Sequence, residues 1–402
     1  MKMRFRIAIA ALAAGLVAVP AIAQKKYDTG ASDTEIKIGQ TMPSSGPASA
    51  YGTIGRVHAA YFKMINEQDG INGRKINFIS YDDGYSPPKA VEMVRKLVEQ
   101  DEVLFTLNTL GTPTNTAIHK YMNGKKVPHL FLATGATKWN DPKNFPWTMG
   151  FNPNYQSEGK LYALDILKNK PNAKIAILYQ NDDYGKDYLK GFMDGLGDKA
   201  KTMVVAQATY EVTDPTVDSQ IVTLQSSGAD TFFNITTPKF AAQAIRKVAD
   251  IGWKPTHYLN QVSASVGSVL TPAGLEKSVG IISMEYFKDP TDPKWFNDQS
   301  MKDYHAFLKA RVPEANAIDG TNVYALLVAQ LAVHVLKQCG DNLTRENVMK
   351  QAASLKNVSL PQLLPGVTAQ TSADDFAPFQ TMVLAKFDGK TWVTMGDAVA
   401  VK

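Results

Sequence analysis

Short apolar runs alternate with amphipathic stretches along the first third of the chain. The apolar runs are typical of strands at residues 35–40, 75–81, 103–107 and 129–132. Between them, residues 52–68 carry apolar side chains at helical spacing, and Ser86 followed by two prolines is typical of a helix start. Because strands alternate with helices, the pattern predicts a parallel sheet with helices on both faces.

The alternation starts again after a stretch rich in Pro, Asn and aromatic residues at 144–154. We expect helices at 155–168, 183–196, 215–227 and 238–251, and strands at 174–179, 203–208, 230–235, 257–260 and 279–284. Long helices are expected at 295–311 and 320–337, a further helix at 344–355, and a hairpin with strands 381–387 and 391–395. The chain length and the restarted pattern predict two domains.

Two neighbouring loops, residues 108–115 and 133–137, carry the candidate binding chemistry. Each follows an apolar run and is rich in Gly and Thr, and the first leads into a helix-like stretch. Free N–H groups at a helix start favour an anion, and Thr hydroxyls add uncharged donors. The lysine spacing of a P-loop is missing, so a small carboxylate fits better than a nucleotide phosphate. Either loop alone could be an ordinary turn with capping threonines, but adjacent strand ends favour a ligand site.

A Tyr-Gly pair occurs at corresponding corners of the two halves. Tyr51-Gly52 and Tyr184-Gly185 each follow an expected strand and open a helix. An internal duplication with a cleft between the halves explains the repeat, and chance is the alternative.

The first residues have the three regions of a secretory signal peptide. Lys2, Arg4 and Arg6 precede the apolar residues 7–19, and Ala-Ile-Ala at 21–23 is a cleavage site. The apolar run is too short for a membrane span. We therefore expect an exported protein that is cleaved after Ala23.

Charge and cysteine content exclude several classes of protein. The chain has 43 Lys and Arg against 38 Asp and Glu, and residues 1–23 hold three of the basic ones. The mature chain is thus nearly balanced, which argues against nucleic acid as a partner. Cys339 is the only cysteine, so neither an intrachain disulfide nor a cysteine metal cluster is possible, and the six histidines lack metal-ligand spacing. We expect no cofactor and no metal, and we interpret Cys339 as a core thiol.

Familiar catalytic motifs are missing from the sequence. There is no nucleophile elbow, no His-Glu-x-x-His, no Walker lysine and no Gly-x-Gly-x-x-Gly. Asp82-Asp83 and Asp182-Asp183 could suggest acid/base pairs, but neighbours on a strand face opposite ways. We expect a binding protein, with an exported hydrolase as the alternative.

The order and spacing of several short stretches resemble a known family. These stretches are 36–52, 66–73, 81–83, 135–137, 183–185 and 238–252. They are similar to the periplasmic leucine/isoleucine/valine-binding proteins, the type I substrate-binding proteins of ABC importers. The resemblance implies an α/β fold with two Rossmann-like lobes joined by a three-crossover hinge near 152–154, 284–286 and 364–367. Lobe 1 would comprise 24–153 and 286–365, and lobe 2 would comprise 154–285 and 366–402.

The resemblance also implies a periplasmic location, partners and ligand contacts. The protein would capture a small molecule in the cleft and deliver it to an ABC permease and ATPase complex in the inner membrane, and we expect a monomer. In this family, strand-end loops of lobe 1 bind the ligand carboxylate and aromatic residues flank the ligand. The expected ligand-binding residues are Tyr51, Gly111, Thr112, Gly135, Ala136, Thr137, Tyr184, Thr236 and Gln261.

Departures from the family pattern bear on the ligand. Gly111 stands where the family has a serine, and Thr236 falls where it has a tyrosine. Residues 260–263 contain no acid, although the family pairs the ligand ammonium with one there. Because a buried ammonium without a carboxylate is costly, we predict an aromatic or other organic acid as ligand. A branched-chain or other amino acid is the alternative, and Glu285 is a candidate to supply the missing charge.

Overall fold

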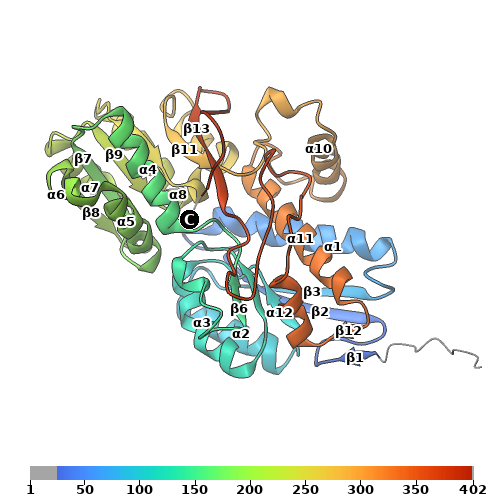
Figure 1. Ribbon diagram of the computed structural model, residues 1–402. Helices are drawn as coiled ribbons and strands as arrows, with labels where there is room; N and C mark the ends of the chain where they lie inside the picture. The colour runs from blue at the N-terminus through green and yellow to red at the C-terminus, as the bar shows by residue number, and fades with distance from the viewer. Residues whose placement is uncertain (1–24, 401–402) are drawn as a thin grey trace, which may run out of the picture.

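The computed structural model describes residues 25–400, so the predicted signal peptide lies outside the described residues. Within this range, no helix combines the length and apolar character needed to cross a membrane. The described chain forms two α/β lobes, each built on its own sheet (Figure 1). The predicted fold class, two Rossmann-like lobes, is confirmed.

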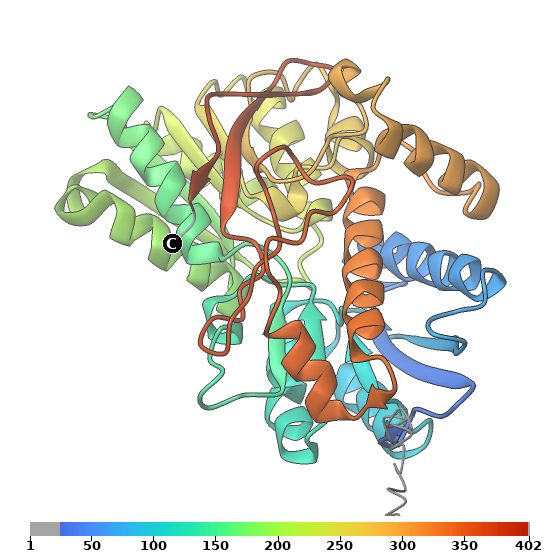
Figure 2. The ribbon, with the colours of Figure 1, turned by 45° about the vertical axis from the view of Figure 1, so that its right-hand side comes forward.

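The first lobe is built on a five-stranded parallel sheet in the order β3-β2-β4-β5-β6. Its apolar strands are buried, and α1 packs against α11 while α2 packs against α3. The strands are β2 (Glu35–Met42), β3 (Lys75–Asp82), β4 (Phe105–Leu107), β5 (His129–Leu132) and β6 (Thr148–Gly150). The helices are α1 (Thr53–Glu67), α2 (Pro87–Glu99) and α3 (Thr112–Lys125), with α10 (Gln299–Arg311), α11 (Gly320–Cys339) and α12 (Arg345–Ala352) added from later in the chain (Figure 2).

The second lobe repeats this strand order as β8-β7-β9-β10-β11 and then adds β13 and β14 antiparallel. The strands are β7 (Ile175–Gln180), β8 (Val204–Tyr210), β9 (Thr231–Ile235), β10 (Thr256–Leu259), β11 (Ile282–Glu285), β13 (Thr381–Phe387), β14 (Trp392–Thr394) and β15 (Val399–Ala400). The main helices are α4 (Tyr155–Asn169), α5 (Asp183–Leu196), α7 (Asp218–Ser226) and α8 (Pro238–Asp250).

The shared strand order positions the cleft. In each lobe the first strand lies between the second and the third, which makes a topological switch point. Ligands bind in open α/β sheets at the carboxyl ends of the strands beside such a point. In the first lobe these ends lead to Tyr51 and to residues 110–112, and in the second lobe they lead to Tyr184 and Thr237.

The chain returns to the first lobe after β11. It remains in the first lobe beyond residues 365 and 366, where the boundary between the lobes was predicted. The amide N–H of Phe376 donates to Asn140 Oδ1 at 2.6 Å, and Thr371 Oγ1 donates to Ala352 O at 2.6 Å. Both acceptors belong to the first lobe. The third crossover therefore lies close to Thr381, where β13 begins.

Candidate functional site

A cavity that is partly open to solvent lies between the lobes, and its empty space is about 820 Å³ when the part open to solvent is included. Five of the nine expected residues line it, from both lobes: Tyr51, Gly111, Thr112, Tyr184 and Gln261. The switch points of the two sheets thus face one space, although contact of these residues with a ligand stays a prediction.

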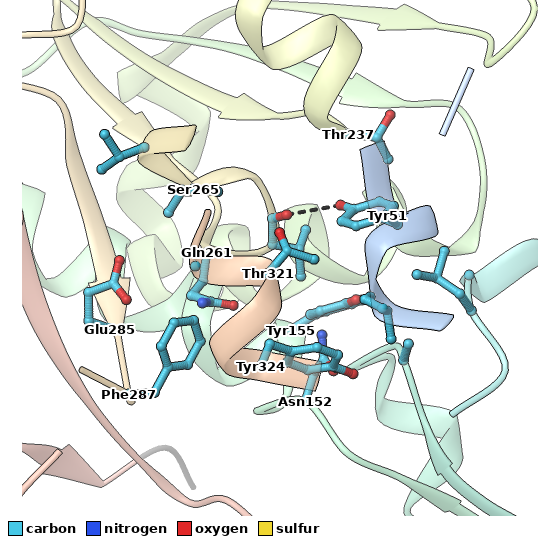
Figure 3. Close-up of a pocket in the computed structure, with 18 of the residues that line it drawn as sticks. Tyr51, Asn152, Tyr155, Thr237, Gln261, Ser265, Glu285, Phe287, Thr321 and Tyr324 are labelled. Atoms are coloured by element: carbon cyan, nitrogen blue, oxygen red, sulfur yellow. Dashed lines mark hydrogen bonds between the residues drawn. The ribbon is translucent and has the colours of Figure 1, made fainter. Parts of the chain in front are cut away.

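The two tyrosines of the repeated corner both reach the cavity. Tyr51 extends from the turn before α1 (Figure 3). Tyr184 lies in the first turn of α5. The Tyr51 hydroxyl donates to Val262 O at 2.9 Å, a bond from the first lobe to the second. The Tyr184 hydroxyl accepts from Asn260 Nδ2 at 2.7 Å. Burial raises the pKa of both phenols well above the ordinary value, so both stay neutral.

The loop before α3 depends on a glycine in an unusual conformation. Gly111 has φ +99°, which favours glycine, and a Cβ there would lie 2.5 Å from the Tyr85 ring. The space left by this glycine is therefore occupied by Tyr85, which itself lines the cavity. Thr112 follows as the first residue of α3, with Pro113 next. Its hydroxyl lies 2.7 Å from Thr134 Oγ1, within the first lobe.

The second predicted loop occupies a different place. Gly135 and Ala136 are outside the cavity lining and border a smaller hollow beside Asn154. Thr137 donates both its N–H and its hydroxyl to Asp187 Oδ2, at 2.8 and 3.0 Å. The donors expected to hold a ligand carboxylate therefore hold a carboxylate of the second lobe.

Thr236 and Gln261 differ in their exposure to the cavity. Thr236 is fully buried outside the lining, where its hydroxyl donates to Asn234 Oδ1 at 2.7 Å, and its neighbour Thr237 lines the cavity instead. Gln261 lines the cavity, and its N–H donates to Glu158 Oε1 at 2.8 Å. Its side chain has no hydrogen-bond partner among residues 25–400, so the amide is available to a ligand.

The buried carboxyl group of Glu158 fixes the position of Gln261. Besides this N–H, it accepts from the hydroxyls of Tyr162 at 2.9 Å and Tyr188 at 2.7 Å. Burial raises the pKa of Glu158 to about 7, and the three donors lower it in part. One side chain of α4 thereby holds the turn after β10.

Aromatic side chains that were not expected line much of the cavity: Tyr85, Tyr155, Phe287, Tyr324 and Trp392. Tyr155 lies 5.6 Å from Tyr184 in an edge-to-face arrangement, measured between ring centroids. The sequence did carry a signal, because Tyr155 and Phe287 directly follow two of the predicted crossovers.

The charged groups of the lining are both acidic. Glu285 and Asp289 line the cavity, and no Lys, Arg or His among the described residues does so. Burial raises the pKa of Glu285 well above the ordinary value, and the nearby carboxyl groups of Asp289 and Glu158 add to the effect. The cavity therefore lacks a protein cation that could bind an anionic ligand.

Contacts between the lobes close the cavity. Lys138 Nζ lies 2.6 Å from Asp183 Oδ2, and Ser265 Oγ donates to Asp319 Oδ1 at 2.6 Å. Together with the bonds of Tyr51 and Thr137, these contacts join the first lobe to α5 and to residues 262–265. The described conformation is closed.

The candidate acid/base pairs have structural roles. Asp82 accepts from the N–H groups of Ser44 and Gly84, and Asp182 is the N-cap of α5. No group of three or more potential metal-ligating side chains occurs among residues 25–400.

Comparisons with known proteins agree with this geometry. A profile of the periplasmic binding protein family matches residues 35–391. The chain is 24% identical over 341 residues to Leu/Ile/Val-binding protein homolog 1 of Brucella abortus, covering 82% of this chain and 86% of that one. It is 27% identical over 185 residues to the leucine-specific-binding protein of Salmonella typhimurium, which covers 46% of this chain and 48% of that protein's length.

Solved structures share the fold at low sequence identity. A branched-chain amino acid ABC transporter protein from Thermus thermophilus with bound valine has a TM-score of 0.82 at 14% identity, covering 92% of this chain and 97% of that one. A fatty acid ABC transporter substrate-binding protein from Thermomonospora curvata has a TM-score of 0.79 at 20% identity, covering 94% and 95%. Because the family profile matches most of the chain, this protein belongs to the periplasmic binding proteins, in the group of leucine/isoleucine/valine-binding proteins.

Proposed function

We propose that this protein is the substrate-binding component of an ABC importer, which captures a small carboxylate-bearing ligand and delivers it to a permease and ATPase complex in the inner membrane. The proposal rests on one observation. A cavity lies between the two lobes, and hydrogen bonds from one lobe to the other hold the lobes together around it. A ligand bridging both lobes favours the closed form, which a permease can distinguish from the open form.

Neutral donors are suited to hold the ligand carboxylate. Thr112 begins α3, and free backbone N–H groups at a helix start attract an anion. No basic side chain of the described residues lines the cavity. In this proposal the ligand carboxylate is therefore bound by uncharged donors such as these N–H groups. Thr321 Oγ1 and the Gln261 amide add donors without hydrogen-bond partners among the described residues.

The rest of the ligand is apolar or aromatic in this proposal. Tyr51, Tyr155, Tyr184, Phe287 and Trp392 surround the cavity. Rings of this kind bind an apolar body over a large area at a low cost in conformational entropy. The amino-acid alternative is supported by the names of the relatives, since one is a leucine-specific-binding protein. We propose no enzymatic role, since these relatives are named as binding proteins.

The first experiment identifies the ligand and tests the cleft. Mass spectrometry of small molecules released on denaturation gives candidates, and calorimetric titration into ligand-free protein gives their affinities. Tyr51→Ala and Tyr184→Ala should each weaken binding by about 10- to 100-fold. The control is Tyr121→Ala, because Tyr121 lies on α3 outside the lining and bonds to Glu99. Full affinity in both cavity variants would refute the placement of the ligand.

A further inference from the structure

The carboxyl group of Glu158 connects three elements of the second lobe behind the wall of the cavity. It lies in the first turn of α4 and is 2% exposed. Its Oε1 atom accepts from the Gln261 N–H at 2.8 Å and lies 2.9 Å from the Tyr162 hydroxyl, and its Oε2 atom lies 2.7 Å from the Tyr188 hydroxyl. The Tyr162 hydroxyl also lies 3.0 Å from Leu259 O. The cluster therefore joins α4 and α5 to the end of β10 and to the turn that follows it.

The four contacts of this cluster need four protons. A tyrosine hydroxyl and an N–H each donate one proton, and a carbonyl or carboxylate oxygen donates none. If Glu158 is ionised, only three protons are present, so Tyr162 can donate to Glu158 or to Leu259 O but not to both. If Oε1 carries a proton, it donates to Tyr162, and Tyr162 donates to Leu259 O. The geometry thus satisfies every contact only when Glu158 is protonated.

The titratable groups around Glu158 include no cation among the described residues. They are Tyr155 and Tyr162 on α4, Tyr188 on α5, Glu285 at the end of β11 with Tyr286 after it, and Tyr258 on β10, which packs against Tyr162. Burial raises the pKa of each of these groups. Burial also raises the pKa of Glu158 to about 7, and its three donors lower it in part. The protonated acid is therefore favoured up to nearly neutral pH.

The turn that Glu158 holds supplies part of the cavity wall. Gln261 and Val262 line the cavity (Figure 3). Val262 O accepts from the Tyr51 hydroxyl of the first lobe at 2.9 Å. A shift of this turn would therefore change both the wall that faces a ligand and a bond between the lobes.

We propose that Glu158 is a positioning residue of the cavity, which acts as the protonated acid and holds the turn at both Leu259 and Gln261. When the turn opens, water reaches the carboxyl group and the group ionises as an exposed acid does. Opening therefore releases a proton and becomes more favourable as pH rises. The consequence for binding rests on the proposed function, because a ligand that contacts Gln261 needs the closed turn.

The size of the effect follows from the pKa of Glu158 in the two states. The pKa is 4.5 for an ordinary glutamic acid and about 7 in the closed turn. Between these values each pH unit should favour opening by up to about tenfold, and above pH 7 the effect should level off because both states are ionised.

Hydrogen exchange measures opening of the turn in the ligand-free protein. The observable is the protection factor of peptides that cover residues 258–264, which is the exchange rate of the unfolded peptide divided by that of the native protein. It should fall by about 10- to 100-fold from pH 5 to pH 7 and change little from pH 7 to pH 8. Peptides that cover residues 204–210, on the far edge strand β8, should not show this fall.

Two variants separate the proton from the contacts. Glu158→Gln keeps the size of the side chain and an oxygen that can accept from the Gln261 N–H, but it does not titrate, so its protection factor should be equal at pH 5 and pH 8. Glu158→Leu removes all polar atoms and should lower protection by about 10-fold at pH 5. The control Glu92→Gln changes an exposed residue of α2 and should match the wild type. The pH series on the unchanged protein does not depend on folding of a variant.

Three results would overturn the proposal. Equal protection at pH 5 and pH 8 in the wild type would show that no proton holds the turn. A fall of the same size in Glu158→Gln would assign the proton to another group, and a fall of the same size at residues 204–210 would assign it to unfolding of the whole lobe. Because every measurement is made without ligand, these results leave the proposed binding function intact.

Discussion

The backbone at Gly111 shows how one residue shapes the cavity wall. A side chain at this position would need φ near +99° and would meet both the Tyr85 ring and Thr114 Oγ1, at 2.5 and 2.7 Å. The same helix, α3, contains Gly124, where φ is not positive and an added Cβ would contact nothing within 4 Å. The two glycines therefore have different reasons to be present.

Alanine substitutions at these two glycines should have opposite effects. Gly111→Ala should lower the free energy of unfolding by about 1–3 kcal/mol because it strains the backbone and displaces Tyr85. Gly124→Ala should raise it by about 0.5–1 kcal/mol, as alanine favours a helix interior. Urea unfolding of both variants measures the difference, and equal effects would contradict the role assigned to Gly111.

Glu158 should make the stability of the protein depend on pH. Its pKa is raised from the ordinary 4.5 to about 7, so the native state keeps a proton that the unfolded chain releases between these values. Its contribution to stability therefore falls as pH rises from 4.5 to 7, by up to ~1.4 kcal/mol per pH unit. In Glu158→Gln this decline should be absent, which urea unfolding at pH 5 and pH 8 would show. The control is Glu92→Gln, which should show the same decline as the wild type. If the free energies of unfolding of the wild type and Glu158→Gln differ by the same amount at pH 5 and at pH 8, the decline does not come from Glu158.

At the scale of elements, α5 joins the lobes through its first two turns. Asp187 accepts from Thr137 and from Gln156 Nε2, and Asp183 pairs with Lys138. On the same helix, Asp194 pairs with Lys190 one turn away, at an exposed position, and with no other residue of the range 25–400. The helix thus carries one ion pair that joins the lobes, between Asp183 and Lys138, and one that is local, between Asp194 and Lys190.

Removing Asp187 should open the protein. In Asp187→Ala the N–H of Thr137 loses its acceptor and the hydroxyl keeps only the longer bond, to Asn154 Oδ1 at 3.3 Å. The open form therefore gains population and the apparent ligand affinity falls. Small-angle scattering of the ligand-free variant should give a larger radius of gyration than the wild type. Asp194→Ala should leave the radius unchanged, and an equal radius in all three proteins would exclude α5 as a closing element.

Element positions could be predicted well because the determinants are local. Apolar runs such as 129–132 became strands, and the Pro-Pro start gave α2 at its observed place. Partners could not be predicted in the same way, because they depend on packing between distant segments. Thr137 meets Asp187 across 50 residues, and Glu285 of β11 pairs with Val383 of β13, almost 100 residues later in the chain.

At the scale of the whole molecule, ligand binding should stabilise the closed arrangement of two lobes. The cavity is lined from both lobes, so a ligand that bridges them is bound only when they meet. Ligand at about 100 times its dissociation constant should add ~2.7 kcal/mol to stability. Scattering should show a smaller radius of gyration with ligand, and an unchanged radius and melting temperature under saturation would rule out closure by the ligand.

The path of the chain through the two lobes also sets the order in which they can be completed. The outer edge of β11 stays unpaired until β13, which begins almost 100 residues later at Thr381, takes its place in the sheet. An open strand edge is a site of aggregation, and pairing between distant segments slows folding. The sheet of the second lobe can therefore be completed only when nearly the whole chain is present, after the later helices of the first lobe, and the strand β11 that carries Glu285 keeps an open edge until then.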